Sequence, residues 1–197
     1  MVISAGHVLV VCTGNVCRSP YIEWRLRHEL TGSGIHVSSA GTRALVGHDM
    51  DPGTRECLRH RGSDADSFSA RELTADLVRE ADLVVTAARE HRAAAARLHP
   101  PAMVRTFTLR DLGDLLSNLS VDDLAAAPDE HTNWVRQVAA TASRRRGTVP
   151  ARQQGIDVTD PIGGPPSRFV LMAAEVDAAL SPIVAALLHP APRATGG

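Results

Sequence analysis

The sequence predicts an α/β fold, a three-layer sandwich in which helices flank a central parallel sheet of about four strands. Three observations predict it. Short apolar runs alternate with helical patterns at least three times along the chain. These runs are apolar throughout, as expected of parallel strands that are buried on both faces. The 197 residues, 44% apolar and 22% charged, are enough for one domain with a substantial core.

The elements follow from local signals. The first strand is expected at 7–12 (HVLVVC), and Pro20 suits the first turn of the helix that follows, where its missing N–H costs nothing. Glycines then end the first two helices, at Gly32 and Gly62. Further strands are expected at 35–39, 82–87 and 103–108, and helices at 19–31, 51–60, 69–80, 89–98, 109–116 and 168–188. Pro182 predicts a kink or break in the last helix near 178–181.

The segment 117–156 differs from the rest of the chain. Its periodicity is weak, with one helix expected at 130–143, and it has too few large apolar residues for a core of its own. We therefore expect a single domain at 1–190 that contains this segment as an insertion, followed by a disordered tail at 191–197. The arginine run 144–146 is interpreted as a solvated helix face.

Composition excludes several classes of partner. A formal net charge of −1 gives no field that would attract nucleic acid or an anionic membrane. We find no signal peptide and expect no membrane insertion, because no apolar stretch approaches about 20 residues. Three cysteines, two of them nearly adjacent, indicate a reducing compartment and hence a cytoplasmic protein. The oligomeric state stays open.

The stretch VVCTGNVCRSP, residues 10–20, carries the chemistry. It leads from the first strand through a short loop into a helix start, which is the arrangement that turns backbone N–H groups inward around an anion. Gly14 and Asn15 tolerate the backbone angles that such a loop needs. The same setting favours the thiolate of Cys12, and the planar fork of Arg18 suits a tetrahedral oxyanion.

Two other readings of the cysteines explain less. A zinc site needs about four ligands, and the sequence has no second Cys or His cluster at ligand spacing, so we expect no metal. Burial as a small hydrophobe explains Cys12 at the end of a strand. It does not explain Arg18, since a buried arginine needs an anionic partner.

The motif C-x-G-N-x-C-R-S-P at 12–20 resembles that of the low-molecular-weight protein tyrosine phosphatase family. The resemblance covers about 5–115 and 155–188, with 117–156 outside it. It also includes SAGT at 39–42, AREL at 70–73, the strand at 82–86 with REH at 89–91, and Asp160-Pro161.

The resemblance implies a phosphomonoester hydrolase, acting on a phosphorylated protein without a cofactor. Cys12 would form a phosphocysteine intermediate, Arg18 would stabilise the transferring phosphoryl group, and Asp160 would be the general acid. The phosphate would be bound by Thr13, Gly14, Asn15, Val16, Cys17, Arg18 and Ser19.

Supporting roles follow in the same way. Ser19 would steady the thiolate, and Asn15 with Ser39 would support the loop, although each could instead be a cap or turn residue. In this family the second loop cysteine, here Cys17, can form a protective disulfide with the oxidised nucleophile; packing is an alternative role. Cys57 is interpreted as structural.

The substrate is less well defined. The family commonly has aromatic residues at the mouth of the site, where this chain has Leu45 and Ile162-Gly163. We place phosphotyrosine first and keep phosphoarginine as the alternative: Val16 favours the former, and the small loop after Asp160 favours the latter. A thiol-dependent arsenate reductase on the same fold would need further cysteines after Cys57, and a pure phosphate-binding module would not need Asp160.

Overall fold

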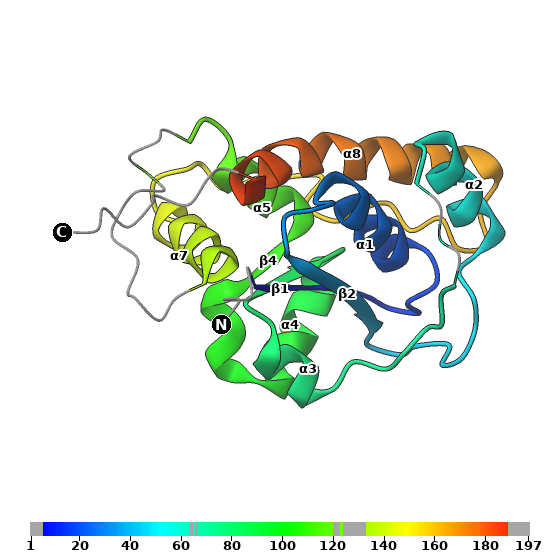
Figure 1. Cartoon of the computed structure of the whole chain (residues 1–197), viewed down its shortest axis with the longest axis horizontal. Helices are drawn as coiled ribbons and strands as arrows, with labels where there is room; N and C mark the ends of the chain where they lie inside the picture. Colours follow the sequence, from blue (N-terminus) through cyan, green and yellow to red (C-terminus); the bar gives the residue numbers. More distant parts are fainter. Residues whose placement is uncertain (1–5, 64, 66, 120–122, 124–132, 189–197) are drawn as a thin grey trace.

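The computed structural model describes residues 6–63, 65, 67–119, 123 and 133–188. Four strands form one parallel sheet in the order β2-β1-β3-β4, which confirms the predicted architecture (Figure 1). Their bounds are β1 His7–Cys12, β2 His36–Gly41, β3 Leu83–Thr86 and β4 Thr106–Thr108. Because Cys12 is opposite Gly41, and Val11 is opposite Thr86, the carboxyl ends of the first three strands meet at one edge.

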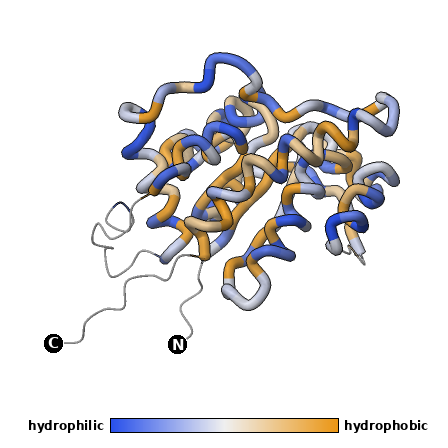
Figure 2. Tube along the Cα trace, turned by 90° about the horizontal axis from the view of Figure 1, so that it is seen from above, coloured by the Kyte–Doolittle hydropathy of each residue, from blue (hydrophilic) through white to orange (hydrophobic). Residues whose placement is uncertain are grey.

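Helices cover both faces of the sheet. They are α1 Arg18–Glu29, α2 Pro52–His60, α3 Ala75–Glu80, α4 Arg89–Leu98, α5 Leu109–Leu116, α7 Trp134–Arg145 and α8 Pro166–Leu188, with a 3₁₀ helix, η1, at Pro100–Arg105. On β1, Val8 and Val10 belong to the large core cluster under α1, α5, α7 and α8, whereas Leu9 and Val11 pack with α3 and α4. Figure 2 shows the apolar strands in the middle of the molecule.

The predicted helix at 69–80 is wrong in its first half. Residues before Ala75 run alongside β2: Gly41 N–H donates to Arg71 O at 2.9 Å, and Leu73 N–H donates to Gly41 O at 2.7 Å. The helix begins only after Thr74, whose hydroxyl accepts from Leu77 N–H. The backbone N–H and C=O groups at the end of β2 require hydrogen-bond partners. Pairing with them outweighs the tendency of residues 69–74 to form a helix.

The predicted strand at 103–108 is wrong up to residue 105. Residues 100–105 form η1, and β4 is only three residues long. Pro100 and Pro101 have no N–H to give to a sheet but fit the first turn of a helix, so helical geometry begins there.

The described part of 117–156 packs against the same core as the rest of the chain. The helix α7 ends close to its predicted position, and the predicted start at residue 130 lies outside the described residues, as does the tail. Val135, Val138 and Ala142 are buried in the large cluster. The reading of the arginine run as a solvated face is wrong for two residues, because Arg145 contacts Asp123 and Arg146 lies over the Phe107 ring.

The last helix, α8, runs unbroken through Pro182, so the predicted break is absent. By length and composition α8 could cross a membrane, with a mean hydropathy of 1.8, so the expectation that no stretch approaches that length is wrong. Its apolar side instead lies in the large core cluster, where Met172, Val176 and Ile183 are fully buried. A core role therefore accounts for the apolar residues on this side of the helix.

Candidate active site

The anion-binding loop, residues 12–18, joins the end of β1 to the start of α1 at the carboxyl edge of the sheet. Its carbonyl groups point to a neighbouring segment: Thr42, Arg43 and Leu45 donate backbone N–H groups to the carbonyls of residues 12, 13 and 14 at 2.9–3.0 Å. Since these carbonyls are engaged on the outside, the loop can present its N–H groups on the other side. This is the backbone pattern of an anion-binding nest.

Asn15 fixes the shape of the loop. Its φ of 55° is left-handed, and its side chain is fully buried. The side-chain amide nitrogen donates to Ser19 Oγ at 2.9 Å and to Ser39 Oγ at 2.7 Å, while its oxygen accepts from Arg71 N–H at 2.9 Å. One side chain thus ties the loop to α1, to β2 and to the segment beside β2.

A second layer of polar groups supports Asn15. Ser39 Oγ donates to Glu23 Oε2 at 2.5 Å, and Arg71 Nε donates to Ser39 O at 2.7 Å. Burial raises the pKa of Glu23, and Arg27 pairs with the same carboxylate at 2.6 Å. Sequence reasoning did not single out Glu23; a charged residue in the buried first half of α1 is the signal that could have revealed it.

The thiol of Cys12 contacts a hydroxyl that is oriented toward it. Cys12 is buried, 2% exposed, and its Sγ lies 2.9 Å from Ser19 Oγ. Because Ser19 Oγ already accepts a hydrogen bond from Asn15, it can direct its own hydrogen to the sulfur. A hydrogen bond of this kind stabilises the charged form of the acceptor, here a thiolate.

The other two cysteines differ from Cys12. Burial, followed by the nearby Asp51 carboxylate, raises the pKa of Cys17 to about 12, so this thiol is protonated at neutral pH. Cys17 packs with Val16 and Phe169, and Cys57 lies against the same small cluster. All three cysteines are free thiols in this structure.

Arg18 and Asp160 meet although 142 residues separate them. Arg18 Nη2 lies 2.6 Å from Asp160 Oδ2; the arginine side chain is nearly buried, and that of Asp160 is 44% exposed. Backbone hydrogen bonds hold the approach to Asp160: Val158 N–H donates to Ala87 O, and Thr159 N–H donates to Glu175, both at 2.8 Å. Cys12, Arg18 and Asp160 line one pocket of about 370 Å³.

A buried histidine from α4 also reaches the loop. His91, 1% exposed, places Nε2 2.8 Å from Thr13 Oγ1, and the same hydroxyl accepts from Arg18 Nη2 at 3.3 Å. Burial, followed by the charge of Arg18, lowers the pKa of His91 to about 4, so the ring is neutral. His91 belongs to the motif at 89–91, but that motif alone does not place the histidine in the site, because only the fold brings α4 to Thr13.

Within the part of the chain that the structure describes, no group of three or more His, Cys, Asp or Glu side chains is arranged to hold a metal ion. The groups that the described site offers for chemistry are the thiol, the guanidinium, the carboxyl group and the loop amides.

Sequence comparison connects this geometry with known proteins. A family model described as low molecular weight phosphotyrosine protein phosphatase matches residues 7–144. The probable low molecular weight protein-tyrosine-phosphatase EpsP of Ralstonia nicotianae is 37% identical over 105 residues, which are 53% of this chain and 71% of that protein. Etp of Escherichia coli K12, a low molecular weight protein-tyrosine-phosphatase, is 37% identical over 102 residues, 52% of this chain and 68% of its own.

Solved structures share the fold. The tyrosine phosphatase AmsI of Erwinia amylovora superposes with a TM-score of 0.64 at 23% identity, covering 91% of this chain and 92% of that one. The YwlE arginine phosphatase of Geobacillus stearothermophilus gives a TM-score of 0.65 at 22% identity, covering 91% of each chain.

Fold and sequence together define a hydrolase, a protein tyrosine phosphatase. The chain belongs to the low-molecular-weight phosphotyrosine protein phosphatase family. The family match runs into α7, so the resemblance extends further than the 5–115 expected from motifs. It ends before Asp160, and the role of that residue therefore has to be argued from geometry.

Proposed function

We propose that the chain hydrolyses phosphomonoesters on proteins in two steps through Cys12. The thiolate attacks phosphorus, the S–P bond forms as the bond to the leaving oxygen breaks, and Asp160 gives that oxygen a proton. Water then attacks the phosphocysteine, with Asp160 accepting a proton, and releases phosphate and the thiolate. The observation that carries the proposal is that Cys12 and Arg18, from one loop, and Asp160, 142 residues after Arg18, line the same pocket.

The anion-binding loop supplies the electrostatic part of the mechanism. Arg18 and the inward N–H groups would bind the phosphoryl oxygens and stabilise their charge as it redistributes. We assign phosphate binding to the residues of this loop and the helix start, namely Thr13, Gly14, Asn15, Val16, Cys17, Arg18 and Ser19. Ser19 would keep the sulfur ionised, and the contacts of Asn15 and Ser39 would hold the loop in shape.

Phosphotyrosine is the substrate that the mouth of the pocket favours. Leu45 and Ile162 line it and are 47% and 53% exposed, so they offer apolar contact to an aryl ring in place of an aromatic wall. Arg43 also belongs to this lining, where Asp160 is the one acidic residue and is already paired with Arg18. The positive charge of Arg43 disfavours a guanidinium-bearing substrate.

Phosphoarginine is the second candidate. The loop after Asp160 is small, with Gly163 in a left-handed conformation at φ 68°, and a small loop would suit a long, flexible side chain. The proposed setting for either substrate is the cytoplasm, where the free thiols would stay reduced.

The test is hydrolysis of an aryl phosphate, with chelator present, by wild type, Cys12→Ser, Asp160→Asn and the control Cys57→Ser, whose thiol does not line the pocket. We expect no turnover by Cys12→Ser, and a loss of about 10²–10⁴-fold in kcat for Asp160→Asn, the range for general acids. The control should match wild type. Activity in Cys12→Ser would refute the mechanism, and phosphotyrosine and phosphoarginine peptides assayed in parallel would decide the substrate.

A further inference from the structure

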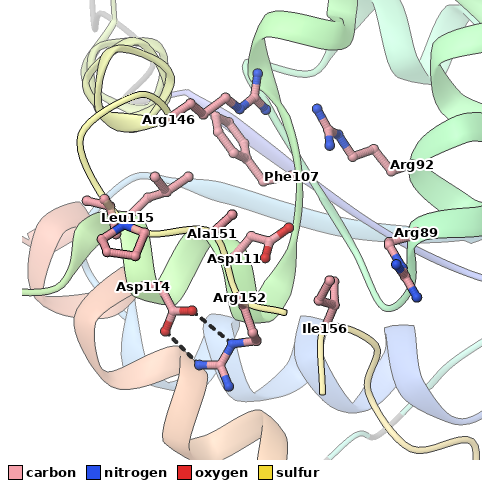
Figure 3. Close-up of a pocket in the computed structure, with 12 residues that line it drawn as sticks. Arg89, Arg92, Phe107, Asp111, Asp114, Leu115, Arg146, Ala151, Arg152 and Ile156 are labelled. Carbon is pink, nitrogen blue, oxygen red and sulfur yellow. Dashed lines mark hydrogen bonds and ion pairs between the residues drawn. The ribbon is translucent and has the colours of Figure 1, made fainter. Parts of the chain in front are cut away.

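A second cavity, separate from the catalytic pocket, lies between α4, α5 and the segment after α7. Its volume is about 340 Å³, within the range of small-molecule sites, and it shares no residue with the pocket around Cys12. Figure 3 shows its lining, with Arg92 of α4 and Arg146 at one end of the cavity and Arg152, paired with Asp114, at the other.

Two of these arginines carry charges without an acidic partner. Arg92 Nε and Arg146 Nη2 both donate to the same carbonyl oxygen, Thr106 O, at 3.1 and 2.7 Å, so the two guanidinium groups are neighbours. Their other hydrogen bonds, to the Met103 sulfur and carbonyl, are also uncharged. Among the described residues, neither guanidinium has a carboxylate within ion-pair distance.

The remaining charges of the cavity are largely paired with one another. Arg152 holds Asp114 through two hydrogen bonds of 2.6 and 2.8 Å, and Arg89 lies 3.7 Å from Asp157. Asp111 is the one further carboxylate in the lining. Two free guanidinium groups against one carboxylate leave an excess of positive charge.

The fold holds the guanidinium groups of Arg92 and Arg146 close together although their charges repel. Arg146 lies over the Phe107 ring, 4.0 Å from its centroid, and each guanidinium is fixed by a backbone carbonyl. Burial, together with the charge of Arg92, lowers the pKa of Arg146. An anion placed between the two guanidinium groups would relieve this repulsion and gain charge-assisted hydrogen bonds.

The rest of the lining is apolar. Leu115, Val149, Pro150 and Ile156 face the cavity beside the arginines. Inorganic phosphate alone would leave this surface uncovered, whereas a ligand with an apolar ring would bury it.

We propose that this cavity binds a small organic anion, whose phosphate or carboxylate lies between Arg92 and Arg146 and whose ring lies against Leu115 and Ile156. The proposal does not rest on the catalytic mechanism above. Its failure would leave that mechanism unaffected, because the cavity and the catalytic pocket share no residue.

The test uses the full chain carrying Cys12→Ser and Arg18→Ala, which removes turnover and the catalytic anion site. The protein, labelled with ¹⁵N, is titrated with 2-naphthoate, with 2-naphthyl phosphate and with inorganic phosphate. We expect one of the two naphthyl anions to bind with a Kd below about 1 mM. Amide shifts should change at Arg92 and along 146–156, and inorganic phosphate should bind more weakly.

Matched variants locate the site. Arg92→Gln in the same background should weaken binding about tenfold, the size of a lost charge-assisted hydrogen bond. Arg97→Gln, an exposed arginine on the same helix outside the lining, should leave binding unchanged. The spectra report whether each variant is folded. No binding below about 1 mM, equal binding by Arg92→Gln, or inorganic phosphate binding as tightly as both naphthyl anions would overturn the proposal.

Discussion

At the scale of single residues, the relay from Asn15 through Ser19 to Cys12 links loop shape to thiol chemistry. Asn15 uses both amide hydrogens on two serines, which leaves the Ser19 hydrogen free for the sulfur. The same side chain therefore sets the backbone of the loop and the direction of a hydroxyl. A replacement at Asn15 would disturb both at once, so Ser19 is the better position at which to test the thiol contact.

Removing the Ser19 hydroxyl should lower activity without unfolding the protein. In Ser19→Ala the thiolate loses one hydrogen bond, which is worth about 1.5–3 kcal/mol when one partner is charged. We expect kcat/KM for an aryl phosphate to fall about tenfold or more. Ser69→Ala, an exposed serine outside the catalytic pocket, serves as the control. An unchanged kcat/KM in Ser19→Ala would contradict the assigned contact.

His91 should act through Thr13 on Arg18. The neutral ring contacts the Thr13 hydroxyl, which in turn accepts from the guanidinium. We expect His91→Ala to raise KM for an aryl phosphate and weaken vanadate binding, because Arg18 loses part of its support. Since both residues act in one chain of contacts, Thr13→Val and His91→Ala should be non-additive in a double-mutant cycle. Fully additive losses would show that His91 acts only through packing.

At the scale of elements, the contact between β2 and the loop depends on a glycine. A Cβ at Gly41 would lie 2.4 Å from Thr13 O and 3.0 Å from Asn15 N, both backbone atoms of the loop. Neither helix nor strand geometry requires a glycine at this position. The close approach of the two backbones requires it. SAGT at 39–42 is recognisable as a motif in the sequence, but this steric reason is visible only in the structure.

Replacing this glycine should therefore affect both stability and activity. We expect Gly41→Ala to lower the free energy of unfolding by about 1–3 kcal/mol, as overpacking does, and to lower kcat because the loop has to shift. Urea denaturation and aryl phosphate hydrolysis measure the two effects. Gly47→Ala is the comparison variant. A Cβ added at Gly47 has no heavy atom within 4 Å, so this variant introduces backbone strain at a φ of 82° without a steric clash. A fully stable and active Gly41→Ala would show that the loop tolerates displacement.

Two segments adopt a conformation different from the one predicted because of the elements around them. Residues 69–74 have a helical pattern, yet their backbone pairs with the end of β2. The run 103–105 is apolar enough for a strand, yet two prolines start a 3₁₀ helix before it. At 69–74 the deciding partner, the end of β2, is distant in the sequence. At 100–105 the conformation depends on prolines that have no N–H group. Hydrophobic periodicity reflects neither effect.

At the scale of the whole molecule, the half-buried His7 and the buried His91 make stability depend on pH. Burial, followed by the nearby His36, lowers the pKa of His7 to about 4, and that of His91 is lowered to a similar value. Both histidines titrate near 6.5 when unfolded, so between about pH 6.5 and pH 4 the unfolded chain binds more protons than the folded one. Their contribution is therefore constant above pH 6.5 and becomes destabilising as the pH falls.

This dependence can be measured. We expect the free energy of unfolding of wild type to fall as the pH is lowered from about 6.5 to 4, and His7→Gln to show a smaller fall. His28→Gln, at an exposed position on α1, should keep the wild-type slope. Equal slopes in wild type and His7→Gln, measured by urea denaturation across this range, would contradict the assignment.

The sequence by itself determined the parallel α/β sandwich, the anion-binding loop and the residues Cys12 and Arg18, because strand and helix periodicity and a nine-residue motif are local properties. The family resemblance also pointed to Asp160, and the tertiary structure places its carboxylate against Arg18 across 142 residues. Only the tertiary structure decided that His91 from α4, and the Glu23 and Arg71 support behind Asn15, reach that loop. It also brought Arg92 and Arg146 to one carbonyl oxygen. The physical reason is that hydrogen bonds and charges act over a few ångströms in space, whereas a sequence records only order along the chain.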